Sequence, residues 1–259
     1  MGENTTFEYL GYIAISVSLI LLGYASWSDW RTREVTNYVW LVLAPVGAVL
    51  TFLRIFLLQA PVLYAVWALI VGLVAVISIA LFYFGFWGGA DFKAFVTLSL
   101  LFPWSPSAIT PLLTVQMPFF PFTILINTLF LSMSVVIYVL AKNIAWKVPN
   151  RRSLFEGFEN ESTPRKILAL LVGYKVKKEK LGGQHHFFLA ESHPTGDGEG
   201  PKHCFKIQTE ECNSVSLEEL PAEVWVTPQL PMMIFLTLGT ATALFLGDFL
   251  LWLLMNIHL

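Results

Sequence analysis

The sequence predicts an all-α bundle that crosses a membrane about six times and carries one small, β-rich domain outside the membrane. Of the 259 residues, 56% are hydrophobic and 13% are charged, about half the charged fraction of a soluble domain. Apolar runs near the roughly 20 residues that span a bilayer recur along the chain. The composition excludes an ordinary soluble domain, a disordered chain and a disulfide-stapled secreted domain.

Six apolar segments are predicted to span the membrane. The first lacks the cationic start and the cleavage site of a signal peptide, so we expect it to be retained as a helix. The fourth meets Pro103, Pro106 and Pro111 and is therefore short or broken. The predicted spans are Tyr9–Trp27, Asn37–Leu58, Val62–Phe86, a segment that begins at Phe92, Phe119–Ala141 and Leu230–Met255.

The hydrophilic stretch between the fifth and sixth spans predicts a small water-exposed domain. Val172, Tyr174 and Val176 alternate with glycine or lysine, which is a strand pattern. Ser192–Lys202 is rich in proline and glycine and is expected to be a loop. Other strand-like runs are Gln184–Ala190, His203–Ile207 and Val224–Thr227. The predicted division is 1–141 for spans one to five, 142–227 for the domain and 228–259 for the sixth span.

The basic residues predict the orientation, because loops rich in lysine and arginine stay in the cytoplasm. If the first span runs from outside to inside, every lysine and arginine except Arg54 faces the cytoplasm. This orientation requires the fourth segment to cross and places both termini outside.

Only three aspartates occur among the spans and their short connections: Asp29, Asp91 and Asp248. Asp29 follows the first span and Asp91 follows the third, so both carboxyls reach the cytoplasmic boundary. Neighbouring carboxyls share a proton, and one then acts as a base while the other acts as an acid. The alternatives are a charge balanced by Arg31 or Arg33 for Asp29, and a helix N-cap for Asp91. We expect Asp248, near the outer end of the sixth span, to make a polar interhelical or interfacial contact.

The residues around Asp29 resemble a motif of the type IV prepilin peptidases. Residues 27–37 read WSDWRTREVTN, which is similar to the family pattern D-x-x-x-R-x-(I/V)-x-N. Asp29, Arg33, Val35 and Asn37 occupy its defined positions.

The residues before Asp91 resemble the second motif of the same family, G-x-G-D. The chain has Gly88, Gly89, Ala90 and Asp91 at these positions. Ala90 therefore stands where the motif has its second glycine. Alanine resists positive φ and adds a methyl group where a substrate backbone would pass. Within this family the chain is more similar to the archaeal branch, the preflagellin and prepilin peptidases, whose members have six spans and a cytoplasmic domain and lack the cysteine-rich zinc segment of many bacterial relatives.

The resemblance implies a membrane-boundary aspartic endopeptidase with Asp29 and Asp91 as the catalytic pair. Its substrates would be preflagellin or type IV pilin-like precursors, cut after a short basic leader on the cytoplasmic side. Arg33 and Asn37 would hold the Asp29 loop, whereas Lys93 would either contact the pair or anchor the fourth helix. The family uses no metal or cofactor in this step.

Two other functions compete with a peptidase. A small ion- or proton-coupled transporter would use Asp29 and Asp91 as binding sites, although transporters place such groups near the midplane and often show repeats. A non-catalytic assembly factor would use only the cytoplasmic domain. The net charge of −2 indicates no nucleic-acid partner, and the histidines and two cysteines lack metal-ligand spacing. The bilayer is the expected environment, and the oligomeric state is left open.

Overall fold

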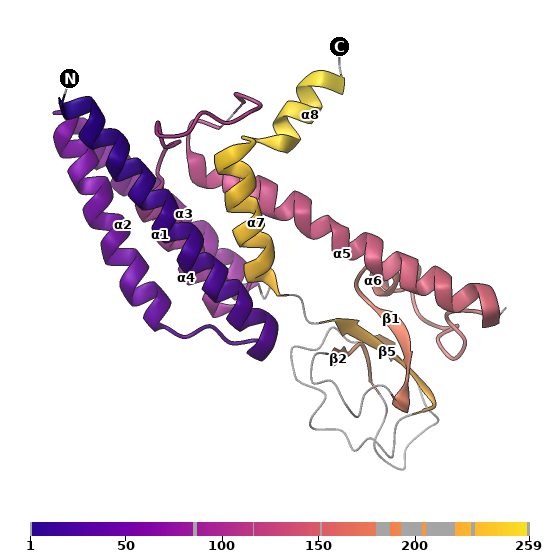
Figure 1. Cartoon of the computed structure of the whole chain (residues 1–259). Coiled ribbons are helices and arrows are strands. Elements are labelled where there is room, and N and C mark those ends of the chain that lie inside the picture. Colours follow the sequence, from indigo (N-terminus) through magenta and orange to yellow (C-terminus); the bar gives the residue numbers. More distant parts are fainter. Residues whose placement is uncertain are drawn as a thin grey trace. The chain divides into compact units, whose positions relative to one another are not determined.

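The structure is a computed structural model that describes residues 2–84, 87–115, 117–150, 152–179, 187–192, 204–205, 221–228 and 231–257. The chain divides into two compact units. The first unit comprises Met1–Ser132 and Pro231–Leu259, and the second comprises Met133–Leu230. Long helices make up the first unit, and the second contains a small sheet (Figure 1).

The first four helices lie in the first unit. α2 and α3 agree closely with the second and third predicted spans. α1 is longer than predicted, because its backbone hydrogen bonds continue past the apolar run that ends at Trp27. Asp29 therefore lies in the last turn of α1 and not in the turn after it. The bounds are α1 (Gly2–Thr32), α2 (Tyr38–Leu57), α3 (Val62–Tyr83) and α4 (Gly89–Leu101).

α4 is the buried helix of this unit and packs against α2, α3 and α7 (Met232–Phe245). Phe95, Leu98 and Leu101 of α4 are fully buried. α2 approaches α4 closely at Gly47, where an added Cβ would lie 3.1 Å from the Cβ of Leu101. Small residues commonly allow such close packing between membrane helices.

α4 ends at Leu101 because Pro103 follows and has no backbone N–H to continue the helix. Two neighbouring helices satisfy its last carbonyls: the Thr51 hydroxyl donates to Leu101 (3.1 Å), and the Trp67 indole donates to Leu100 (3.2 Å). With 13 residues, α4 is about 20 Å long and shorter than the roughly 30 Å hydrocarbon core. A short fourth segment is thus confirmed, although its helix begins at Gly89 and not at Phe92.

The prediction that the sixth span is a single helix is wrong. The span consists of α7 and α8 (Phe249–Ile257), which are bent by 62° at the break between them. Gly247 at this break has a φ of 98°, a conformation that glycine adopts without steric cost. Hydropathy could not locate the break, because apolar residues surround it on both sides.

Side-chain hydrogen bonds hold the break between α7 and α8. Asn127 of α5 (Phe120–Asn150) donates its amide to the carbonyl of Gly247 (2.8 Å) and accepts the N–H of Phe249 (3.1 Å). Asp248 accepts the N–H of Leu251 (2.9 Å) and so caps α8. This side-chain bond of Asp248 is local to α8, whereas an interhelical or interfacial contact was expected.

Four of the described helices are long and apolar enough to cross a membrane: α1 from Thr5, α2, α3 and α5. α7 and α8 would add a fifth crossing if the bent pair forms one span. The chain is a multi-pass membrane protein, but the prediction of about six spans is not confirmed. α5 also extends beyond its predicted end at Ala141, to Asn150.

The second unit contains a three-stranded antiparallel sheet, in the order β1-β5-β2, and a separate pair, β3-β4. Each predicted strand overlaps one of these strands, although residues 184–186, 203 and 206–207 lie outside the described residues. The loop predicted over 192–202 also lies outside them, except for Ser192, which ends β3. The bounds are β1 (Tyr174–Lys177), β2 (Phe187–Leu189), β3 (Glu191–Ser192), β4 (Cys204–Phe205) and β5 (Glu223–Pro228).

One helix of the second unit, α6 (Thr163–Val172), was not predicted. Val172, expected in a strand, is its last residue, and β1 begins only after Gly173. The small core under α6 contains Trp225, which is fully buried. The indole of Trp225 stacks on the ring of Phe155, with 5.7 Å between the ring centroids.

Candidate active site

Asp91 lies in the first turn of α4, outside the long membrane-spanning helices. Its Oδ2 accepts the N–H of Gly88 at 3.0 Å, so the side chain also caps its own helix. Asp91 is only 9% exposed. Burial raises the pKa of Asp91 from 3.8 to about 6, although the hydrogen bond from Gly88 opposes this shift.

Asp29 projects from the last turn of α1 to the N-terminus of α7. Its Oδ2 accepts the N–H of Met233, the second residue of α7, at 3.2 Å. The first N–H groups of a helix have no partner within the helix, and the helix dipole favours a carboxylate at this end. The donor is a backbone group, so no residue type in the sequence indicated it.

Asp29 and Asp91 interact electrostatically. The charge of Asp29 adds to the rise in the pKa of Asp91, as a nearby like charge does. The first unit thus places the two predicted carboxyls, from α1 and α4, within range of this electrostatic interaction. A carboxyl that keeps its proton to about pH 6 beside a second carboxyl is an arrangement for acid–base chemistry on a water molecule.

Polar side chains connect α1 to α7 on the same faces that carry Asp29 and Met233. The hydroxyls of Ser26 and Thr237 lie 2.6 Å apart. The Ser26 hydroxyl can also donate to the carbonyl of Met233 (2.9 Å), and the Thr237 hydroxyl to that of Leu22 (3.2 Å), although their two protons make only two of these three bonds at once. Leu22, Ser26 and Asp29 are spaced four and three residues apart and share one helix face. These contacts fix the N-terminus of α7 against Asp29, and the sequence analysis missed them.

Lys93 and Asn37 connect the two motifs directly. The Lys93 ammonium donates to the Oδ1 of Asn37 at 2.7 Å. Asn37 precedes α2 at the N-cap position but makes no side-chain bond to that helix. Both residues were expected to support the site, but their pairing was not foreseen, because 56 residues separate them.

Arg33 directly follows α1 and has a left-handed backbone conformation, with a φ of 58°. Its N–H bonds the carbonyl of Asp29 at 3.1 Å, and its guanidinium attracts the Asp29 carboxylate. The Nε and Nη1 atoms of Arg33 are buried and make no hydrogen bond to any residue that the structure describes. A non-glycine residue in this region is strained, and such strain is concentrated at functional sites.

The two glycines before Asp91 differ in their surroundings. A Cβ at Gly88 would lie 3.3 Å from the Oδ2 of Asp91, whereas at Gly89 the nearest atom lies 4.0 Å away, in the ring of Phe82. Ala90 lies within α4 and has no positive φ. The left-handed turn that would have required glycine at this position is therefore absent.

Among the residues that the structure describes, no three histidine, cysteine or acidic side chains form a group that could hold a metal ion. His185, His186, His193 and His203 lie outside these residues.

Two family models match most of the chain. The type IV leader peptidase family matches residues 16–141, which include both aspartates, and the archaeal peptidase A24 C-terminus type II matches residues 165–249. The chain is 26% identical to a preflagellin peptidase of Methanococcus voltae, over 91% of this chain and 96% of that protein. It is 24% identical to a preflagellin peptidase of Methanocaldococcus jannaschii (92% and 94% covered) and 26% identical to one of Methanococcus maripaludis (92% and 95%). These matches, which agree with the resemblance of the two motifs, show that the chain belongs to the type IV leader peptidase family.

Proposed function

We propose that the protein is an aspartic endopeptidase that removes a short basic leader from preflagellin or type IV pilin-like precursors. The observation that carries this proposal is the interaction between Asp29 and Asp91, of which Asp91 has a pKa of about 6. The substrate class is supported by the preflagellin peptidases that align with nearly the whole chain. No metal or cofactor takes part.

The two carboxyls have different roles in the proposed reaction. Asp29 takes a proton from a water molecule, and the resulting hydroxide adds to the carbonyl carbon of the scissile peptide bond. The Asp91 proton passes to the carbonyl oxygen at the same time. When the resulting diol collapses, the C–N bond breaks, the amine leaves with the proton held by Asp29, and a diol proton returns to Asp91.

The site is proposed to lie at the cytoplasmic boundary of the membrane. Asp29 is three residues from the end of α1, a candidate span, and Asp91 is at the start of α4. A precursor with a basic leader and an apolar helix would keep its helix in the bilayer and its leader in the cytosol. The depth of the membrane would then place the scissile bond beside the two carboxyls.

The neighbouring side chains are proposed to position this pair. The bond between Lys93 and Asn37 fixes the residue before α2 to the second turn of α4. Arg33 balances the charge of Asp29. Gly88 and Gly89 leave room for an extended substrate backbone, with Ala90 directed into the helix packing.

Replacing Thr237 by valine should lower kcat for leader cleavage about tenfold with little change in KM. The variant loses the bonds to Ser26 and Leu22, each worth roughly 1 kcal/mol in a membrane, and the N-terminus of α7 is then less well fixed beside Asp29. Steady-state kinetics in vesicles measure the split between kcat and KM.

Thr237→Ser keeps the hydroxyl and should restore kcat. Thr240→Val is the matched control, because the Thr240 hydroxyl bonds the Leu236 carbonyl of its own helix and, among the described residues, no other helix. Equal kcat for Thr237→Val and Thr240→Val would show that the contact with Ser26 does not position Asp29.

The substrate proposal is tested with the full-length protein in vesicles and a preflagellin-like precursor. We expect cleavage after the basic leader, and roughly a tenfold lower kcat/KM when the small residue before the cut is replaced by a bulky one, because Gly88 lies directly against Asp91. An uncut precursor would contradict the proposed function. Equal processing of the two precursors would contradict a close approach of the backbone at Gly88.

A further inference from the structure

α6 exposes a continuous apolar face in the second unit. Ile167, Leu168, Leu171 and Val172 are 37–53% exposed. Their spacing of one, four and five residues places them on one side of a helix. The opposite side, which includes Ala169, packs onto the core around Trp225.

Asn143 ties α6 to the membrane-spanning helix α5. Asn143 is 2% exposed and donates its amide to the carbonyls of Leu170 (3.2 Å) and Gly173 (2.9 Å), at the end of α6. The 31 residues of α5 extend over about 47 Å, whereas the hydrocarbon core is about 30 Å thick. Roughly the last ten residues of α5 therefore project beyond the core, and Asn143 lies near the boundary.

The side chains of α5 around Asn143 are also those expected near the boundary of the hydrocarbon core. Lys142 and Lys147 flank Asn143, and lysines anchor helices at the interface. The outward apolar side chains of α5 continue to the same level, because Ile144 and Val148 are both more than 60% exposed. α6 is thus bonded to α5 where the lipid-facing surface of α5 reaches the headgroups.

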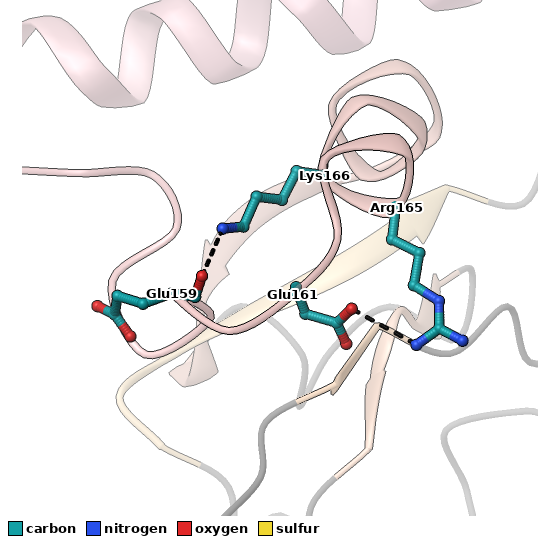
Figure 2. A network of polar contacts seen from close by, with 4 residues as sticks. All are labelled: Glu159, Glu161, Arg165 and Lys166. Carbon is teal, nitrogen blue, oxygen red and sulfur yellow. Dashed lines mark hydrogen bonds and ion pairs between the residues drawn. The ribbon is translucent and has the colours of Figure 1, made fainter.

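Two basic residues in the first turn of α6 make polar contacts with the residues that precede the helix (Figure 2). Arg165 forms an ion pair with Glu161 (3.5 Å), and Lys166 donates to the carbonyl of Glu159 (2.9 Å). Lys166 also lies over the ring of Phe155, at 5.8 Å from its centroid. The two cations thus lie beside or behind the apolar face, as in helices that lie in a membrane interface.

We propose that α6 lies in the membrane–water interface, with Ile167, Leu168, Leu171 and Val172 in contact with lipid. The second unit is then held to the bilayer at α6 as well as through α5. A second copy of the chain is a poorer occupant, because four partly exposed side chains offer far less than the about 800 Å² per partner of a stable protein interface.

Nitroxide labels on the full-length protein test this proposal. Cys204 and Cys212 are replaced by serine, and a single cysteine is introduced as Ile167→Cys or Leu171→Cys, with Arg165→Cys as the matched control on the same helix. The protein is reconstituted in vesicles of equimolar phosphatidylcholine and phosphatidylglycerol. The labels at 167 and 171 should be accessible to oxygen and protected from a water-soluble nickel complex, and the label at 165 should show the reverse.

Two results would overturn the proposal. The first is equal nickel accessibility at all three positions in vesicles whose protein still cleaves precursor, because α6 would then face water. The second is protection accompanied by spin–spin broadening that increases with protein density, because a second copy would then cover the face.

Discussion

Asp29→Asn and Asp91→Asn should each abolish leader cleavage while the protein still folds and inserts into the membrane. Asparagine keeps the size of the side chain and one acceptor oxygen, so the N–H groups of Met233 and Gly88 keep a partner. It cannot exchange a proton with water or with the peptide carbonyl. We expect kcat to fall at least about a thousandfold, as when other catalytic acid–base groups are removed.

Asp248→Asn is the matched control for these two variants. Asp248 is the third aspartate of the membrane part, and asparagine can replace it as the N-cap of α8. Precursor cleavage in vesicles should be retained in this variant and lost in the other two, at equal expression. Normal processing by Asp29→Asn or Asp91→Asn would exclude the aspartic mechanism.

The sequence predicted the helices of the first unit better than their ends. Hydropathy located α2 and α3 because their apolar runs coincide with the helices. It placed the end of α1 too early, because Asp29 and Arg31 are polar but remain helical. It also missed the break at Gly247, where only the backbone conformation changes.

The side chains of the candidate site could be predicted, but their contacts could not. Asp29 and Asp91 were selected because carboxyls are rare in membrane segments and because the topology placed both on one side. The bond from Met233 could not be foreseen, since any residue offers a backbone N–H at a helix start. The Lys93–Asn37 pair joins segments whose separation along the chain carries no signal.

The pH dependence of cleavage should show a fall in kcat/KM as the pH rises through about 6. The proposed reaction requires a proton on Asp91, and burial raises the pKa of Asp91 to about 6. Above that pH, the protonated fraction falls about tenfold for each pH unit.

The raised pKa of Asp91 also affects the stability of the fold. The folded state holds this proton more tightly than the unfolded chain, whose carboxyl has its ordinary pKa of 3.8. The stabilisation is therefore complete below that value and is lost as the pH rises through about 6.

Infrared difference spectra can separate this carboxyl from the other acidic groups of the chain. The band of a protonated carboxylic acid should disappear with a midpoint near the alkaline limb of kcat/KM, and it should be missing in Asp91→Asn. Asp248→Asn should keep that band, so its spectrum serves as the control. A profile that stays flat between about pH 5 and 8 would mean that no carboxyl titrates in this range during catalysis. If kcat/KM falls with rising pH but the Asp91 band disappears at a different pH, a group other than Asp91 is the acid. Agreement between the two midpoints would tie the burial of Asp91 at the start of α4 to its role as the acid, because the same desolvation sets both.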